Sequence, residues 1–216
     1  DREDEVLRRT NPYSSSNAAA EVILQGYLHS YHEPIVIIRA NNLYGIRQFP
    51  EKIIPRFICH MLTGRKLTLH GNGTNRRHYL SAQDFAEAVV FVAEKGEVGE
   101  VYNIGTTEEY TNLQVAELIS KAFDKPSREV ITYIPDRPFN DGRYSVSWDK
   151  LMHMGWKPKN NLSDDIGMLV DWYRDNFARY PELFGELPAS AAVEVEVAGL
   201  LPVQEVSNGL AKGLSS

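Results

Sequence analysis

The stretch PIVIIRANNLYGIRQFPEKIIP, residues 34–55, decides the fold class of this chain. It opens with a short β-branched run, Pro34–Ala40, which is typical of a strand buried on both faces of a parallel sheet. Polar residues follow directly, and a helical pattern begins after Pro50 and stops at Gly64. This order predicts an α/β protein whose ligands bind beyond the carboxyl ends of its strands.

Helical and strand-like patterns continue on both sides of this stretch. Residues 13–30 carry apolar side chains at helical spacing, and Pro12 lies where a helix start tolerates proline. Downstream, the patterns predict strands at 66–73, 100–106, 128–135 and, more weakly, 141–147, and helices after Pro50 and at 83–95, 111–123, 149–154 and 163–178. Thr111 is the expected N-cap of the helix at 111–123.

Composition limits the classes of function. The chain has 216 residues, of which 43% are hydrophobic and 24% charged, enough for one large domain or two small ones. A net charge of -6 argues against a nucleic-acid partner. There is no apolar run of the ~20 residues that a membrane span needs and no secretory signal, so we expect a cytoplasmic protein. The single cysteine, Cys59, predicts a buried thiol, and the spacing of the histidines predicts no metal site.

The first motif with chemical meaning is NPYSSSNAAAE, residues 11–21, where Tyr13 is followed one helical turn later by Asn17. A lysine one turn from a tyrosine lowers the pKa of a phenol and makes it a useful base. Asn17 is neutral and supplies no such charge. Tyr13 is therefore either a catalytic residue with an altered partner or an ordinary tyrosine at the start of a helix.

Three polar loops carry groups that suit an anionic ligand. Asn41 and Asn42 follow the buried strand, as ligand-binding residues or as turn formers. The stretch GNGTNRRHYL, residues 71–80, sets two arginines after a glycine turn, which suits a phosphate or a solvated hairpin. The stretch PDRPFNDGRY, residues 135–144, is either a pyrophosphate clamp or an ion-paired loop.

Taken together, these stretches resemble a known family. TNPYSSSNAAAE, RANNLYGIRQFPEKIIPRFI, LHGNGTNRRHYLSAQDFAEA and DRPFNDGRY stand in an order and spacing similar to those of the nucleotide-sugar 4,6-dehydratases. These enzymes are extended short-chain dehydrogenase/reductases that act on dTDP-glucose or UDP-glucose, and they include the dehydratase part of plant rhamnose synthases. The resemblance runs from Thr10 to about Asn176.

The resemblance implies a fold and a set of domains. A Rossmann-like parallel sheet would bind NAD, and a smaller C-terminal α/β lobe would bind the nucleotide sugar. Residues 1–185 would be the C-terminal part of such an enzyme, with the two parts interleaved, and the N-terminal half of the Rossmann domain would be missing. We expect residues 186–216 to form a disordered tail, although the alternation in VEVEV (193–197) would also suit a strand.

The resemblance also implies roles for single residues. Tyr13 matches the catalytic tyrosine, and Asn17 stands at the place of its lysine partner. The cofactor would be contacted by Tyr13, Asn17 and Asn42. The substrate would be contacted by Asn41, Lys52, Leu69, His70, Arg77, Asn112, Asp136, Arg137 and Asn140. The implied partner is a nucleotide sugar, and helix 13–30 would serve a possible homodimer.

Departures from the family pattern leave several functions open. The printed sequence lacks a glycine-rich phosphate turn and the acid/base set that the family carries upstream of its tyrosine. The chain is therefore predicted to be part of a 4,6-dehydratase that is inactive alone. The alternatives are a non-catalytic nucleotide-sugar-binding remnant, a scaffold protein, and a nucleotide-sugar epimerase of the same superfamily. No residue distinguishes a UDP sugar from a dTDP sugar.

Overall fold

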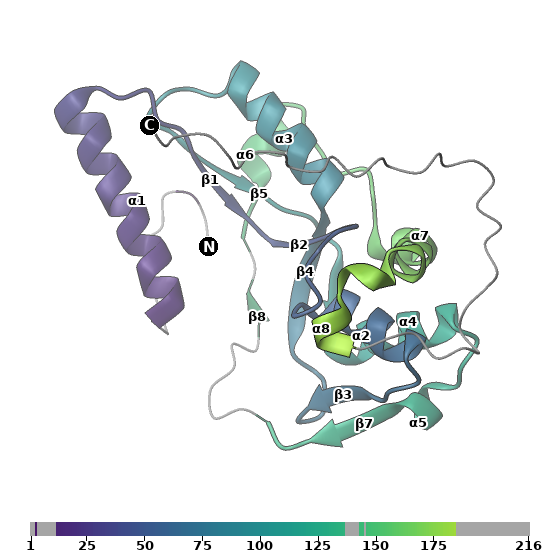
Figure 1. The fold of residues 1–216 in the computed structure, drawn as a ribbon. Helices are drawn as coiled ribbons and strands as arrows, with labels where there is room; N and C mark the ends of the chain where they lie inside the picture. The colour runs from purple at the N-terminus through teal and green to yellow at the C-terminus, as the bar shows by residue number, and fades with distance from the viewer. Residues whose placement is uncertain (1–2, 4–11, 137–142, 145, 185–216) are drawn as a thin grey trace, which may run out of the picture.

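The computed structural model describes residues 3, 12–136, 143–144 and 146–184, which form an α/β arrangement with a long helix at one side (Figure 1). In chain order the elements are α1 (Pro12–Tyr31), β1 (Ile37–Ala40), β2 (Asn42–Tyr44), α2 (Ile53–Leu62), β3 (Leu67–His70), β4 (Arg76–Ser81), α3 (Ala82–Lys95), β5 (Val101–Ile104), β6 (Glu109–Thr111), α4 (Asn112–Ala122), α5 (Ser127–Val130), β7 (Ile131–Ile134), β8 (Arg143–Tyr144), α6 (Asp149–His153), α7 (Leu162–Asp175), a 3-10 turn (Phe177–Arg179) and α8 (Pro181–Phe184). The predicted tail, 186–216, lies outside the described residues.

The strands pair mostly in parallel, as the sequence predicted. β1 pairs with β5 in a register that opposes Ile37 to Val101, and β3 pairs with β7 in the same sense. β2 and β8 lie parallel to β4, while β6 runs antiparallel to it. Because the connections between parallel partners are helical crossovers, this is the partial Rossmann-like α/β fold that the sequence predicted.

Local side-chain signals set the starts of two helices that flank the candidate site. The Ser81 hydroxyl accepts a hydrogen bond from the Gln83 amide at 3.2 Å and so caps α3. The Thr111 hydroxyl accepts one from the Gln114 amide at 3.0 Å, and the Gln114 side chain accepts one from the Thr111 amide at 2.8 Å. This reciprocal capping box confirms Thr111 as the N-cap of α4.

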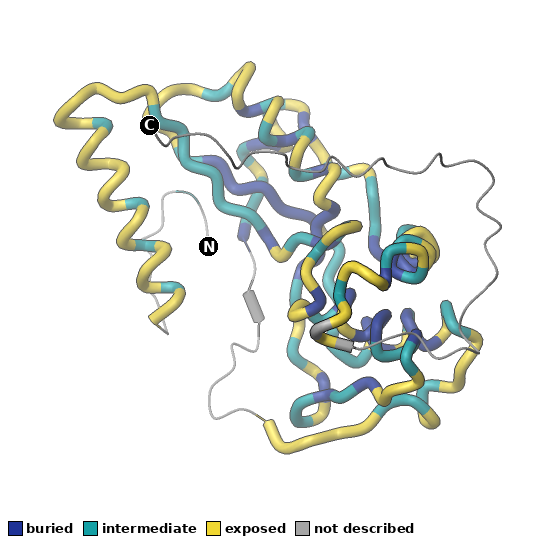
Figure 2. Tube along the Cα trace, viewed as in Figure 1, coloured by how far each residue is buried: buried dark blue, intermediate teal, exposed yellow. Residues whose placement is uncertain are grey.

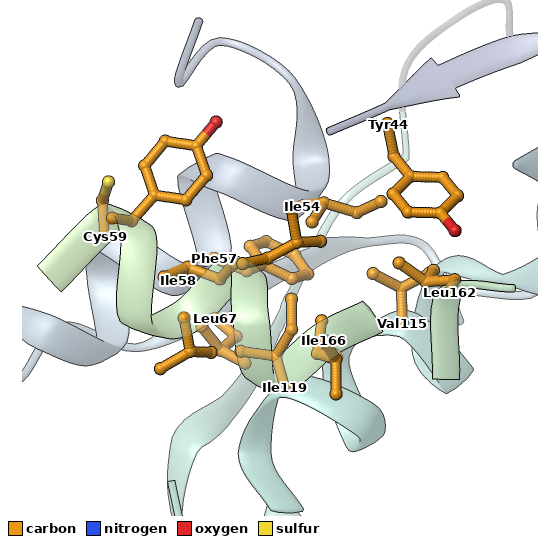
Figure 3. Close-up of a cluster of buried hydrophobic side chains, with 14 of the residues drawn as sticks. Tyr44, Ile54, Phe57, Ile58, Cys59, Leu67, Val115, Ile119, Leu162 and Ile166 are labelled. Carbon is orange, nitrogen blue, oxygen red and sulfur yellow. The ribbon is translucent and has the colours of Figure 1, made fainter. Parts of the chain in front are cut away.

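Two clusters of buried apolar residues hold the fold together. In the larger one, Ile54, Phe57 and Ile58 of α2 converge with Ile119 of α4 and Ile166 of α7 (Figure 3). The smaller cluster packs α3 and α6 against the β1–β5 pair. The first cluster fixes α2, β3 and α4 relative to one another, and three of the predicted ligand-binding residues, Leu69, His70 and Asn112, lie on β3 and α4.

The structure differs from the sequence-based expectation at three elements. All four residues of β1 are half-buried rather than buried, because among the described residues only β5 is paired with it. No residue of α1 is buried, and the helix is exposed along most of its length (Figure 2). Residues 127–130 form a helical turn rather than a strand, because Pro126, with φ -63°, starts a turn and delays β7 to Ile131.

The side chain of Cys59 is fully buried in the larger cluster, as predicted. Burial raises the pKa of its thiol to about 12, so the reactive thiolate is scarce near neutral pH.

We expect the native chain to resist a thiol-reactive dye at pH 8, because Cys59 is buried, and the urea-unfolded chain to react with one equivalent. Rapid labelling of the native chain would show that α2 does not pack as described.

None of the described helices combines the length and the apolar character that crossing a membrane requires.

Candidate nucleotide-sugar site

A cavity of about 920 Å³ lies at the junction of the β2–α2 loop, α2, β3, β4 and the start of α4. Its volume is in the range of small-molecule sites in proteins. Seven of the predicted site residues line it: Tyr13, Asn42, Lys52, Leu69, His70, Arg77 and Asn112. These residues lie between positions 13 and 112 of the sequence and on several different elements. The fold brings them together around one cavity.

The cavity is positively charged although the chain is acidic overall. Lys52, Arg56, Arg65 and Arg77 line it, and among the described lining residues Glu51 is the single carboxylate. The Glu51 carboxylate lies 3.1 Å from the Lys52 ammonium, but both side chains are more than half exposed and solvent weakens their attraction. The field inside the cavity therefore favours an anionic ligand such as a diphosphate.

Sequence reasoning missed the basic face of α2. Lys52, the N-cap of α2, is followed at intervals of four by Arg56 and His60, so the three lie along one side of the helix, and all three line the cavity. Burial lowers the pKa of His60, and the guanidinium groups of Arg56 and Arg65 lower it further. The signal was present in the sequence as an i, i+4, i+8 pattern beginning at Lys52.

The floor of the cavity comes from β3 and β4. Leu69 and Tyr79 are buried there, and burial raises the pKa of the Tyr79 phenol to about 12 although Arg77 opposes the shift. The phenol is therefore neutral at physiological pH. The His70 ring lines the cavity, and its buried Nδ1 has no hydrogen-bond partner among the described residues.

The rim loop, residues 43–50, is tied to α7 and to itself. The Tyr44 hydroxyl donates to Asp165 Oδ2 at 2.7 Å, and the Tyr173 hydroxyl donates to the Gln48 carbonyl at 2.6 Å. The Gln48 side chain in turn donates to the Leu43 carbonyl at 2.8 Å. Burial, reinforced by Asp165, raises the pKa of Tyr44, so this hydroxyl stays a donor. These bonds fix the loop to α7 beside the cavity.

The glycine turn after β3 requires its glycines. Gly71 and Gly73 adopt left-handed backbones, with φ of +56° and +71°. A Cβ on Gly73 would lie 3.0 Å from Leu69 Cδ1, and one on Gly71 would lie 2.9 Å from Asp136 Oδ2. The Asp136 carboxylate therefore lies over this turn, next to the cavity but outside the residues that line it.

The remaining predicted residues lie elsewhere. Asn41 is buried; its Oδ1 accepts a hydrogen bond from the Thr106 amide at 3.2 Å, and its Nδ2 has no partner among the described residues. It does not line the cavity. Asn17 is exposed on α1 and does not line it either. Arg137 and Asn140 lie outside the described residues.

Tyr13 lines the cavity from α1, and an ion pair joins this helix to β1. The Arg39 guanidinium of β1 donates from Nε and Nη2 to the Glu21 carboxylate at 3.0 and 2.7 Å. Both side chains are largely buried, with 11% and 14% exposed. The Tyr13 residue itself is 76% exposed, so it forms part of the open mouth rather than of the floor.

This α/β fold is that of an extended short-chain dehydrogenase/reductase. Residues 1–105 match the model of the NAD dependent epimerase/dehydratase family. Its sequence and its fold both match the extended short-chain dehydrogenase/reductases that act on nucleotide sugars.

Its relatives include dehydratases of two kinds. Over 173 residues, or 78% of this chain, it is 44% identical to the dTDP-D-glucose 4,6-dehydratase of Mus musculus, of which it covers 49%. Over 181 residues, or 84% of the chain, it is 43% identical to a trifunctional UDP-glucose 4,6-dehydratase/UDP-4-keto-6-deoxy-D-glucose 3,5-epimerase/UDP-4-keto-L-rhamnose-reductase of Arabidopsis thaliana, of which it covers 26%.

A solved structure shows the same fold. The dTDP-glucose 4,6-dehydratase of Bacillus anthracis, crystallised in complex with NAD, superposes with a TM-score of 0.78 at 37% identity. The match covers 84% of this chain and 57% of that one. The chain thus spans about half the length of these dehydratases, or less.

Proposed function

We propose that this chain binds a nucleoside-diphosphate sugar in the cationic cavity, as the substrate-binding part of an NAD-dependent 4,6-dehydratase, and that alone it does not turn the sugar over. The observation that carries the proposal is the gathering of Lys52, His70, Arg77 and Asn112 around one cavity. These residues come from four different elements, and each had been assigned to the nucleotide on sequence grounds. The relatives, which act on UDP- or dTDP-glucose by name, support the same substrate class.

The lining residues suit the parts of such a ligand. The Arg77 guanidinium offers a planar fork that matches a diphosphate, and the Lys52 ammonium adds a mobile positive charge. The buried side chains of Leu69 and Tyr79 supply an apolar floor for the nucleoside. Tyr13 and Asn42 line the same cavity and would face the sugar.

The described residues suit only the nicotinamide end of NAD. Tyr13 and Asn42 offer a hydroxyl and an amide to a nicotinamide ribose, but Asn17 places a neutral side chain where an ammonium would strengthen that contact. Bound there, NAD would supply the hydride transfer of the reaction. This chain's own contribution would be to hold the sugar and orient it, since the printed sequence has no glycine-rich turn for the cofactor diphosphate.

Isothermal titration calorimetry with UDP-glucose and dTDP-glucose tests the proposal. We expect saturable binding of at least one of them, weakened by salt because the contacts to phosphate are ionic. Glucose without the nucleotide serves as the control and should show no heat of binding. Absence of binding of both nucleotide sugars at millimolar concentration would refute the proposal.

Asn17→Lys tests whether the tyrosine partner alone limits catalysis. We expect no turnover of UDP- or dTDP-glucose in the presence of NAD, because the family's acid/base residues and glycine-rich turn are not in the printed sequence. The measurement is mass-spectrometric detection of a 4-keto-6-deoxy sugar, with Asn17→Gln as the control. Formation of product by Asn17→Lys would show that the chain is catalytically complete.

We also propose that α1 forms a contact between two copies of the chain. Val22, Ile23 and Tyr27 are 67%, 60% and 52% exposed on this helix, and apolar surface of this kind marks interaction sites. We expect the weight-average mass in sedimentation velocity to rise with concentration, and Val22→Asp to abolish the rise. Glu94→Gln, on the exposed side of α3, is the control. A mass that stays monomeric at all concentrations would contradict the contact.

A further inference from the structure

Helix α1 lies at the margin of the molecule and yet carries Tyr13 to the cavity. Its 20 residues include none that is buried, and Figures 1 and 2 show it standing beside the sheet with most of its surface exposed. Packing of apolar side chains, which positions the other helices, is therefore weak here. Another interaction is therefore needed to set the rotation of α1 about its axis and its position along that axis.

The ion pair between Glu21 and Arg39 has the geometry for that role. Three donor–acceptor distances join the two side chains: Arg39 Nε to both carboxylate oxygens at 3.0 and 3.1 Å, and Nη2 to Oε2 at 2.7 Å. Bidentate pairs of this kind are directional as well as strong. Because both side chains are nearly nine-tenths buried, solvent screens their attraction much less than that of a surface pair.

The positions of the two partners link the helix to the cavity. Glu21 lies eight residues after Tyr13, so both are on one face of α1, two turns apart. Arg39 lies in β1, three residues before Asn42, which lines the cavity. Asn41, between them, is held by the Thr106 amide. The segment that follows β1 is thus held next to the cavity, and the Glu21–Arg39 ion pair joins α1 to this strand.

We infer that the Glu21–Arg39 ion pair positions Tyr13 at the mouth of the cavity. The inference rests on the proposed function of that cavity. A second close approach lies toward the far end of the helix, where Leu28 Cδ2 is 3.4 Å from the Cβ position of Gly99. That contact is apolar and fifteen residues from Tyr13, whereas Glu21 is eight residues from it, so of these two restraints the ion pair acts closer to Tyr13.

A distance measurement by pulsed electron resonance tests the positioning without any ligand. Nitroxide labels would be attached at Ala20→Cys on α1 and Glu117→Cys on α4, both exposed sites, while the buried Cys59 stays unlabelled. We expect one narrow distance distribution in the parent and a distribution at least twice as broad in Glu21→Gln. The charge swap Glu21→Arg/Arg39→Glu should keep the distribution narrow. Arg39→Lys alone should broaden it, but less than Glu21→Gln, because lysine keeps the charge and cannot bind bidentately.

The matched control is Asp171→Asn, which breaks the exposed Arg174–Asp171 pair of α7 and should leave the distribution unchanged. Circular dichroism of each variant checks that the remaining fold is intact, since the two core clusters contain no residue of α1. A distribution that is the same in the parent, in Glu21→Gln and in Arg39→Lys would overturn the inference.

A binding cycle separates positioning from a purely structural role. In the parent, Tyr13→Phe should weaken the binding of UDP-glucose about fivefold, the effect of one lost hydrogen bond. In the Glu21→Gln background the same substitution should have no effect, because the hydroxyl is no longer held in place. An equal effect in both backgrounds would refute positioning. If the parent binds no UDP-glucose, the proposed function fails and the distance measurement alone decides the role of the pair.

Discussion

Replacing Asp84 with alanine is expected to lower the free energy of unfolding by roughly 3–5 kcal/mol, because partly buried N–H groups would lose a charged acceptor. Asp84 is 1% exposed in the first turn of α3. Its carboxylate accepts hydrogen bonds from the Lys159 amide at 3.1 Å, the Asn160 amide at 2.9 Å and the Asn160 side chain at 2.9 Å. No other described residue is recorded as an acceptor for these two amides.

The effect should extend to the candidate site. The turn held by Asp84 leads directly into α7, and α7 supplies Asp165 and Tyr173, which bind the rim loop through Tyr44 and the Gln48 carbonyl. Loosening the turn therefore frees α7 to shift and removes two restraints from the rim. We expect weaker binding of UDP-glucose by Asp84→Ala even at temperatures where the chain remains folded.

Urea unfolding followed by circular dichroism measures the stability change. Asp84→Asn keeps one acceptor oxygen and should lose roughly half as much as Asp84→Ala. Glu87→Gln is the matched control: Glu87 binds the Lys159 side chain at 2.5 Å, three residues further along the same helix, but at the solvent-exposed surface. We expect no measurable change from it. If Asp84→Ala and Glu87→Gln had equal midpoints, the structural role assigned to Asp84 would be wrong.

Arg77→Ala is expected to weaken the binding of UDP-glucose or dTDP-glucose by about 10- to 100-fold, because each charge-assisted hydrogen bond to a phosphate contributes about 1.5–3 kcal/mol. Arg77 lies on β4 with its side chain toward the cavity, and its Nη1 is steadied by the Arg76 carbonyl at 2.7 Å. Arg77→Lys should recover part of the affinity, since it keeps the charge but loses the planar fork.

The adjacent Arg76 provides a control with the same chemistry. Side chains alternate along a strand, so Arg76 faces away from the cavity, where its Nη1 lies 3.4 Å from Glu109 Oε2. Arg76→Ala should leave the affinity unchanged in the same titration. Equal losses from the two alanine variants would mean that general surface charge, rather than a diphosphate contact at Arg77, accounts for binding.

Much of the fold was predictable because the relevant forces act locally. The β-branched run before Asn41, the N-cap at Thr111 and the glycine stop at Gly64 each depend on a few neighbouring residues, and each appears where the pattern indicated. The predicted boundary failed at residues 127–130, where proline geometry outweighed the strand pattern. Of the candidate site, Lys52, His70, Arg77 and Asn112 were predicted from motifs and lie together around the cavity.

The sequence by itself determined which segments become strands and helices, and which loops carry cations, because backbone propensity and hydrophobic period are properties of short segments. Only the tertiary structure decided which of these residues meet. It brought the basic face of α2 into the cavity, left Asn17 and Asn41 outside it, and joined Glu21 to Arg39. Contacts between residues far apart in the chain depend on how elements pack, and packing is set by the whole core rather than by any local pattern.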